Sequence, residues 1–342
     1  MTEYSDKWLE EISSDFIVRT CQLLPEFPDY AHDRCHIPTQ SLSCLPITYR
    51  ALCGSGQEFY IRPVNQCIDD MDMLLYQLDR LAFVDDIPVL PNDVSDLADA
   101  VECLRIEPCF GYPGFIRLRL MGTMIYNWKS HQYCFNRNTS FPARYHRLDT
   151  SDFEADLFSS DELLDEPQTT RIGPAIRVKT IKPAKYDLVD SVWCPYWPKE
   201  GEDWITRCRD CGWPTMDSIE EVLQQGCHVV YVQHRDCGID QQQWRFSFSM
   251  AEVILIQSWT DIQQIVYHLL RCFAKQELIP ENCAKEDEVF CTYHLKTMML
   301  WTCEKMSPKF WSSCSIIAIC CELLKTASRV SSETIFSKLF YP

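Results

Sequence analysis

The sequence predicts an α+β protein in which a mixed sheet with an N-terminal helix precedes a mainly helical second part. Strand-like patterns dominate the first half of the chain, and helical spacing of apolar residues dominates beyond Trp244. The 342 residues are 46% hydrophobic, which is enough for a sizeable core and for two lobes. We expect these lobes to span residues 1–200 and 201–342.

Each element follows from its local pattern. Residues 5–24 carry apolar side chains at helical spacing and predict a long amphipathic helix, after which several prolines interrupt the chain. The predicted strands cover residues 58–62, 70–76, 116–121, 177–180, 186–194 and 228–232. The predicted helices of the second part cover residues 217–225, 249–258, 261–276, 291–304 and 312–328.

Charge and composition narrow the range of partners and compartments. The net charge of −17 repels nucleic acid overall, so any polyanion site must be a local basic patch. The N-terminus lacks the pattern of a secretory signal, and no run of about 20 apolar residues predicts a membrane span. The 20 cysteines are therefore expected to be reduced thiols of a cytoplasmic protein that does not bind membranes.

Two acids stand inside the apolar run that starts at residue 70. Asp70 and Asp72 are two residues apart, so on a strand their carboxylates point to the same side. Two such charges are unfavourable unless a cation lies between them. Paired carboxylates are ligands that Mg²⁺ prefers alongside substrate phosphates, which suggests phosphoryl transfer by two metal ions.

Two further features fit a phosphate-handling site. The Gly54-Ser55 pair predicts a tight turn in which backbone N–H groups and the Ser55 hydroxyl can approach a triphosphate. A third carboxylate is needed to bridge two metals, and the strand-like run from 186 to 194 offers Asp187 and Asp190. These two acids are three residues apart and face opposite sides of a strand, so only one can join the pair.

The order of these motifs resembles the cyclic GMP-AMP synthase (cGAS)-like nucleotidyltransferases of invertebrates. The matching blocks are "GS", "DMD", "CPYWP", "GWP", "GCHVV", "WRFSFSMAE" and "CTYHLKTMMLW", in family order from about residue 53 to 301. The resemblance implies a bilobal nucleotidyltransferase fold with an N-terminal spine helix and an active site between the lobes. It further implies a ligand-activated enzyme of innate immune sensing that joins two nucleoside triphosphates, such as ATP or GTP, into a cyclic dinucleotide.

The resemblance also implies roles for individual residues. Asp70, Asp72 and Asp187 would hold two Mg²⁺ or Mn²⁺ ions, with Asp187 chosen because it precedes Trp197 by ten residues, close to the family spacing. Ser55 would contact the terminal phosphates of the donor nucleotide. The remaining nucleotide contacts would come from Arg245, Ser247, Ser249, Glu252, Thr292, Tyr293 and Lys296.

Two departures from the family pattern concern Tyr267 and zinc. Tyr267 stands where many members carry a lysine, which puts a phosphate contact there in doubt. The segment after residue 249 lacks the His/Cys cluster of the vertebrate zinc insertion. A separate zinc pattern is conceivable in Cys208, Cys211, Cys227, His228, His234 and Cys237, but its spacing fits no standard finger. We expect no zinc.

Two alternatives remain open: a catalytically inert scaffold of the same fold, and a synthetase of linear oligonucleotides with the same metal site. The activating ligand is expected to be double-stranded RNA, bound by local clusters of basic residues. One cluster contains Arg171, Arg177, Lys179, Lys182 and Lys185, and the other contains Lys305, Lys309, Lys325 and Arg329. Either cluster is also compatible with an ordinary solvated surface.

Overall fold

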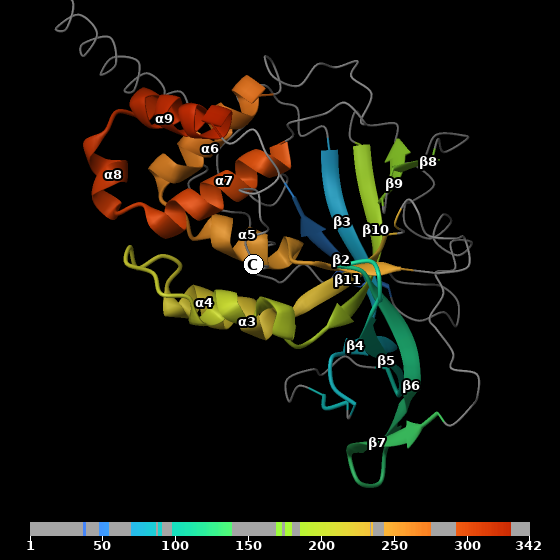
Figure 1. The fold of residues 1–342 in the computed structure, drawn as a ribbon. Coiled ribbons are helices and arrows are strands. Elements are labelled where there is room, and N and C mark those ends of the chain that lie inside the picture. Colours follow the sequence, from blue (N-terminus) through green and yellow to red (C-terminus); the bar gives the residue numbers. More distant parts are fainter. Residues whose placement is uncertain are drawn as a thin grey trace, which may run out of the picture.

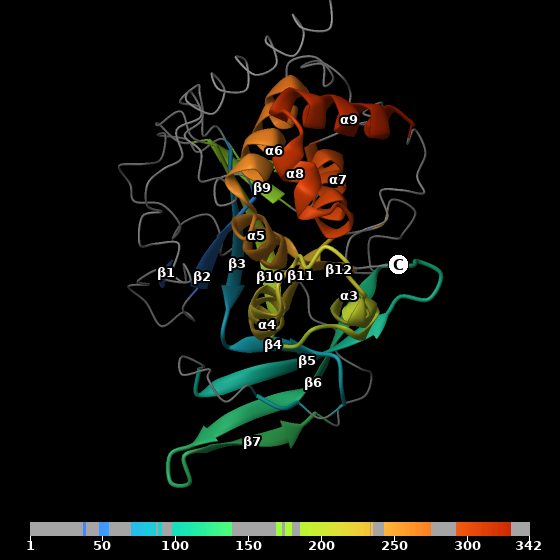
Figure 2. The same cartoon turned by 90° about the vertical axis from the view of Figure 1, so that its left-hand side faces the viewer.

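The computed structural model describes residues 37–38, 48–54, 70–86, 88–90, 98–138, 169–172, 175–179, 185–232, 234, 243–274 and 292–329. Its fold is α+β, with a mixed sheet and helices gathered on one side of it (Figures 1 and 2). The strands are β1 Ile37–Pro38, β2 Thr48–Cys53, β3 Asp70–Gln77, β4 Arg80–Phe83, β5 Ala100–Pro108, β6 Ile116–Asn127, β7 Gln132–Arg137, β8 Thr169–Ile172, β9 Ala175–Lys179, β10 Lys185–Cys194, β11 Cys227–Tyr231 and β12 Trp244–Ser247. The helices are the 3₁₀ turn η2 Lys199–Gly201, α3 Glu202–Thr206, α4 Met216–Gln225, α5 Ser249–Gln257, α6 Asp261–Phe273, α7 Thr292–Lys305, α8 Pro308–Ser313 and α9 Ile316–Arg329.

Strand β10 is the centre of the sheet. Its first half lies between β3, to which it is parallel, and β9, to which it is antiparallel. Its second half pairs with β11, and β12, β6, β5 and β4 continue the sheet from there. The first half of β10 therefore connects the strand that carries Asp70 and Asp72 with the hairpin β8–β9.

The main core lies between the sheet and the helices. Trp204, Trp244 and Tyr267 are among its largest side chains and are at most 1% exposed. Burial of one such aromatic side chain contributes on the order of 2–3 kcal/mol to stability. Figures 1 and 2 show helices α5 to α9 beside β3 and β10, whereas the hairpin β6–β7 extends away at the other end of the sheet.

Local chemistry fixes the ends of several helices. The hydroxyl of Thr215 accepts a hydrogen bond from the backbone N–H of Ser218 and caps the start of α4. Thr260 and Gln263 form a capping box at the start of α6. Gly226 ends α4 with φ +66°, and a Cβ there would lie 2.3 Å from the carbonyl oxygen of Cys194. Only glycine fits this turn into β11.

Most predicted elements of the described regions are present, with one helix divided. The single helix expected over residues 312–328 is two helices, α8 and α9, because the chain is extended at Cys314. The hydroxyl of Ser315 accepts a hydrogen bond from the backbone N–H of Ala318, which starts a new helix. The predicted helix 5–24 and strand 58–62 lie outside the described residues.

The division into lobes at residue 200 stays a prediction. Two strands beyond it, β11 and β12, belong to the same sheet as the earlier strands. Among the described residues, no helix is both long and apolar enough to cross a membrane.

Candidate active site

The register of β3 and β10 brings two of the predicted acids together. In this parallel pair Asp187 lies directly opposite Asp72. Neighbouring residues in register project to the same face of a sheet, so both carboxylates lie on one face. Asp190 instead lies opposite Leu75, three positions further along, where the side chain projects to the other face. The described pairing thus groups Asp187, and not Asp190, with Asp72.

Two further predicted site residues, Asp70 and Ser55, have no described side chain. The backbone of Asp70 begins β3 opposite Lys185. The position of its side chain, and the whole of Ser55, lie outside the described residues. Among the side chains that the structure describes, no three Asp, Glu, His or Cys groups are close enough to hold a metal ion.

Gly54 lies directly against the carboxylate of Asp72. It follows the last residue of β2, and its φ of +65° is in the left-handed region. A Cβ at this position would lie 2.0 Å from Oδ2 of Asp72, so any side chain here would push that carboxylate aside. The glycine of the Gly-Ser pair therefore provides both the turn and the room for this carboxylate.

Arg177 contacts Asp187 from the other side. It lies on β9 directly opposite Asp187, and its guanidinium donates two hydrogen bonds to that carboxylate. The Nε–Oδ1 distance is 2.7 Å and the second nitrogen lies 2.6 Å from Oδ2. This two-pronged, charge-assisted contact is the strongest kind of side-chain hydrogen bonding. The sequence placed Arg177 in a basic cluster and gave no indication of this partner.

Helix α5 packs on the same face of the sheet, next to the acids. Val253 of α5 belongs to a small core with Leu74, and Val189 packs against that core. Leu74 and Val189 are each two residues beyond Asp72 and Asp187, so all four side chains share one face. Asp72 and Asp187 therefore lie about 7 Å along β3 and β10 from the residues that α5 covers.

The residues of the "WRFSFSMAE" block continue from β12 into α5. The guanidinium carbon of Arg245 lies 5.1 Å from the ring centre of Phe115, which supports it from below. The hydroxyls of Ser247 and Ser249 are 3.0 Å apart and share a hydrogen bond. Glu252, in the first turn of α5, is 9% exposed. Its partner comes from another helix.

That partner is Lys296 of α7, whose Nζ lies 2.8 Å from Oε2 of Glu252. The same ammonium lies 5.9 Å from the ring centre of Tyr293, one turn earlier in the helix. Burial is the main cause that raises the pKa of Tyr293, and the negative charge of Glu252 adds to it, while Lys296, a hydrogen bond with Thr297 and the charge of Arg245 lower it. Arg245, Glu252, Tyr293 and Lys296 thus form one cluster.

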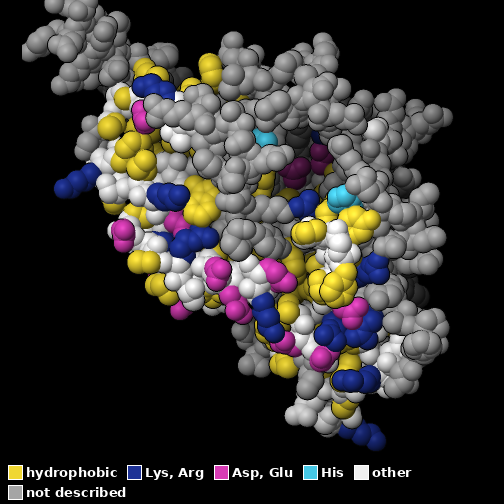
Figure 3. Space-filling model, in the orientation of Figure 1, with side chains coloured by type: hydrophobic (Ala, Val, Ile, Leu, Met, Phe, Trp, Pro, Cys, Tyr) yellow, Lys and Arg dark blue, Asp and Glu magenta, His cyan; other side chains and the backbone are white. Residues whose placement is uncertain are grey.

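Part of the surface of Tyr293 remains open to solvent within this cluster, because the residue is 43% exposed. Thr292, the first residue of α7, is half-buried beside it. Figure 3 shows acidic and basic side chains in a hollow of this face, between the helices and strands β3 and β10 of Figure 1. An exposed aromatic ring, mixed charges and neighbouring carboxylates provide the types of group that bind a nucleotide.

Tyr267 packs inside the core, and Cys211 and His228 of the cysteine and histidine pattern each make hydrogen bonds within the protein. Tyr267 is 1% exposed and packs edge-on against Trp259, so it cannot contact a phosphate. The Cys211 thiol donates hydrogen bonds to backbone carbonyls at the end of α7, whereas His228 contacts Ser191 inside the sheet. These contacts belong to different parts of the protein.

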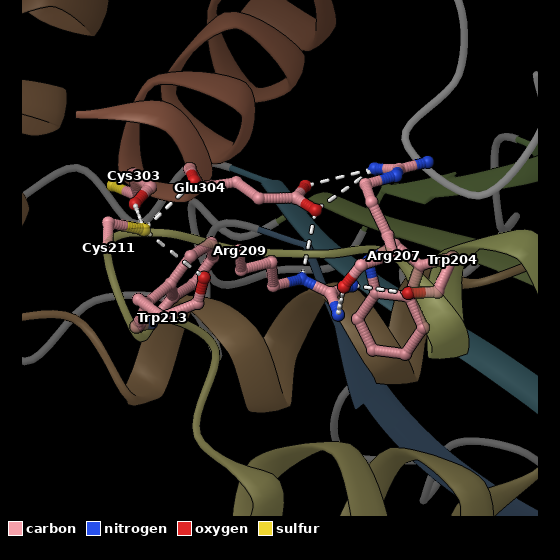
Figure 4. Close-up of polar contacts among 7 residues, drawn as sticks. All are labelled: Trp204, Arg207, Arg209, Cys211, Trp213, Cys303 and Glu304. Carbon is pink, nitrogen blue, oxygen red and sulfur yellow. Dashed lines mark hydrogen bonds and ion pairs between the residues drawn. The ribbon is translucent and has the colours of Figure 1, made fainter.

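A buried ion cluster, shown in Figure 4, was not predicted from the sequence. Glu304 near the end of α7 accepts hydrogen bonds from Arg207 at 3.0 and 3.1 Å and from Arg209 at 2.9 Å. Arg209 also donates to the backbone carbonyls of Arg207 and Trp204. We call the group of Arg207, Arg209 and Glu304 the Glu304 cluster. It fastens the segment after α3 to the helix that carries Tyr293 and Lys296.

Comparison with known proteins bears on the helical end of the chain. Residues 262–337 match the Mab-21 protein HhH/H2TH-like domain, a family of the cGAS/Mab-21 nucleotidyltransferase superfamily. The matched range contains α7 to α9 and all of α6 except its first residue, and therefore Thr292, Tyr293 and Lys296. This end of the chain is thus similar to a domain of nucleotidyltransferase-like proteins, and the mixed α+β architecture agrees with that class.

Proposed function

We propose that this protein is a metal-dependent nucleotidyltransferase that joins two nucleoside triphosphates into a cyclic dinucleotide. The observation that carries the proposal is the register of Asp72 and Asp187 on the face that α5 covers. Helix α5, which covers that face, also carries Glu252, the partner of Lys296 in the cluster with Arg245 and Tyr293. Acids for metal ions and an aromatic, charged surface for nucleotides are the two components that such an enzyme needs.

The donor set fits Mg²⁺ or Mn²⁺. Asp72 and Asp187 present hard oxygen ligands side by side, and Gly54 leaves room for the Asp72 carboxylate. Asp70, two residues before Asp72 in the sequence, would supply the third carboxylate. These three acids would hold the ions. Two bound ions would activate an attacking hydroxyl and neutralise the charge on the leaving oxygen.

The other residues would bind and orient the nucleotides. Ser55 would hold the terminal phosphates of the donor. The ring of Tyr293 would stack on a base, a contact that contributes about 1–3 kcal/mol. Arg245 would read a purine edge with its paired donors, and Lys296 would neutralise phosphate charge. The hydroxyl groups of the nucleotides would be bound by Ser247, Ser249, Glu252 and Thr292. The same residues would keep Arg245 and Lys296 in position.

We further propose that a ligand gates the activity and that the product is a second messenger of innate immune sensing in the cytoplasm. Double-stranded RNA is the preferred ligand because basic residues cluster locally on a chain of net charge −17. Lys305, which stacks on Trp301 with 4.8 Å to the ring centre, and Lys309 are candidates for phosphate contacts. Such binding releases counterions, so activation should weaken steeply with salt.

A second candidate function is supported by one specific observation. Arg177 already supplies a positive charge to Asp187, which a scaffold that no longer binds metal would also require. A linear oligonucleotide synthetase would use the same acids and differ in its product. These alternatives predict different outcomes of the same experiment.

The experiment is incubation of the purified protein with four labelled ribonucleoside triphosphates and Mg²⁺ or Mn²⁺, with and without double-stranded RNA. We expect a cyclic dinucleotide that resists phosphatase, and no product from Asp72→Asn. Linear products would favour the synthetase. No product under any condition, with Mn²⁺ included and a panel of other microbial ligands tested, would favour the scaffold.

A further inference from the structure

Arg177 uses the acceptor atoms that Asp187 would offer to a metal ion. The guanidinium engages both carboxylate oxygens, at 2.7 and 2.6 Å. A divalent cation at Asp187 needs at least one of these oxygens as a ligand. A guanidinium that stays in this position would also repel the incoming cation. Ion pairing and metal binding at Asp187 therefore compete.

The ion pair can open without unfolding the sheet. Arg177 and Asp187 are cross-strand neighbours in the antiparallel pair β9–β10, and the backbone ladder from Ala175 to Lys179 already joins these strands. The Arg177 side chain is 29% exposed, so water can receive the guanidinium when it leaves Asp187. The Asp187 side chain is only 14% exposed, so its carboxylate needs a positive partner, either Arg177 or a cation.

We propose that Arg177 is an internal competitor of the metal ion at Asp187, and that its release sets the metal concentration which the protein requires. This inference rests on the proposed function, because it needs a metal site at Asp72 and Asp187. Before a metal ion binds, Arg177 supplies a positive charge to Asp187 from the side of β9. When an ion binds, Arg177 moves away and its charge remains on the face where substrate phosphates would lie.

The test is direct measurement of Mn²⁺ binding by electron paramagnetic resonance, without nucleotide. In Arg177→Gln the competitor is gone, and we expect Mn²⁺ to bind about tenfold more tightly, equivalent to about 1.4 kcal/mol. Arg177→Lys keeps the charge without the paired donors and should lie between the two. Circular dichroism and thermal unfolding check that each variant is folded.

Arg119→Gln is the matched control. Arg119 also pairs with a carboxylate on a neighbouring strand, Glu107, at 2.5 Å, and its side chain is equally exposed at 29%. Its removal should leave Mn²⁺ affinity unchanged, which separates competition at Asp187 from a general loss of positive charge.

The outcomes distinguish the inference from the proposed function. Equal or weaker Mn²⁺ binding in folded Arg177→Gln, with clear binding in the unaltered protein, would overturn the competitor role and leave the metal site standing. Binding in neither protein would overturn both, because there would be no metal with which Arg177 competes. A gain in Arg177→Gln that disappears when Asp187→Asn is added would support the inference.

Discussion

The Arg177–Asp187 pair and the Glu304 cluster use the same chemistry in opposite surroundings. Both are arginine–carboxylate contacts with nitrogen–oxygen distances between 2.6 and 3.1 Å. Arg177 and Asp187 lie on adjacent strands that a backbone ladder already joins. The Glu304 cluster joins residues 95 and 97 positions apart, and the Glu304 side chain is only 3% exposed.

The two sites differ in the groups that contact each arginine besides its main carboxylate. Arg209 donates to two backbone carbonyls as well as to Glu304 and lies over the Trp204 ring, while Arg207 lies over Trp301. Because these backbone carbonyls and rings are fixed in place, they hold the arginines of the Glu304 cluster in a single geometry. Arg177 instead faces a carboxylate beside a second acid, Asp72, on a partly open surface. We infer that the first contact serves stability and the second can exchange partners.

The largest effect is expected from Glu304→Ala. Burial lowers the pKa of Arg209, the charge of Arg207 adds to this, and Glu304 opposes it. Loss of Glu304 leaves two arginine charges facing each other in a poorly hydrated place. We expect the free energy of unfolding to fall by about 3–5 kcal/mol, measured by urea unfolding. Arg177→Gln should cost less, about 1.5–2 kcal/mol, because the partly exposed pair is lost while the backbone ladder of β9 and β10 remains. Equal losses in the two variants would remove the distinction between the contacts.

Gly54→Ala should damage the acid site more than the fold. The left-handed φ costs an alanine about 1–2 kcal/mol, and its Cβ would displace the Asp72 carboxylate. We expect loss of Mn²⁺ binding by a protein that remains folded. Gly114→Ala is the control, because Gly114 has φ +77° but nothing within 4 Å of an added Cβ. Normal Mn²⁺ binding in Gly54→Ala would show that Asp72 is not a ligand.

The smallest effect concerns the Glu252–Lys296 pair. Its side chains are 12% and 14% exposed, which is more than Glu304 and less than Arg177. Burial and Glu252 raise the pKa of Tyr293, and Lys296 lowers it. Lys296→Met should therefore raise this pKa further, as seen by alkaline absorbance titration against a Tyr293→Phe reference. Lys325→Met, at an exposed pair with Glu322, should change nothing.

The sign of the linked stability follows from the raised pKa. A neutral Tyr293 favours the folded protein, so its contribution is complete below the ordinary tyrosine pKa of about 10 and is lost as the pH rises through the folded-state value. In Lys296→Met this loss should extend to higher pH. A lower Tyr293 pKa in that variant would contradict the geometry of the cluster.

Features that depend on one strand or helix were predictable from the sequence. The strand that begins at Asp70 and the helix that carries Thr292 and Lys296 follow from local patterns and need no knowledge of partners. The preference for Asp187 over Asp190 came from its distance to Trp197, and the parallel register of β3 and β10 gives the same grouping with Asp72.

Features that depend on pairing between distant segments were not predictable. The contact of Arg177 with Asp187 depends on the register of β9 and β10, which no local pattern encodes. The Glu304 cluster depends on contact between segments nearly 100 residues apart in the sequence. Strands β2, β4, β5, β7, β8 and β12 were also missed. Strands β5 and β7 pair with β6, and β4 pairs with β5, so their place in the sheet depends on partners that no local pattern encodes.

The most direct test of the central claim compares Asp187→Asn with Asp190→Asn in metal-dependent joining of nucleoside triphosphates. The two acids are three residues apart on β10, but only Asp187 shares a face with Asp72. The account predicts no detectable product from Asp187→Asn and substantial product from Asp190→Asn, with both proteins folded. Full activity of Asp187→Asn, or loss of activity in Asp190→Asn alone, would contradict the assignment of the acid site.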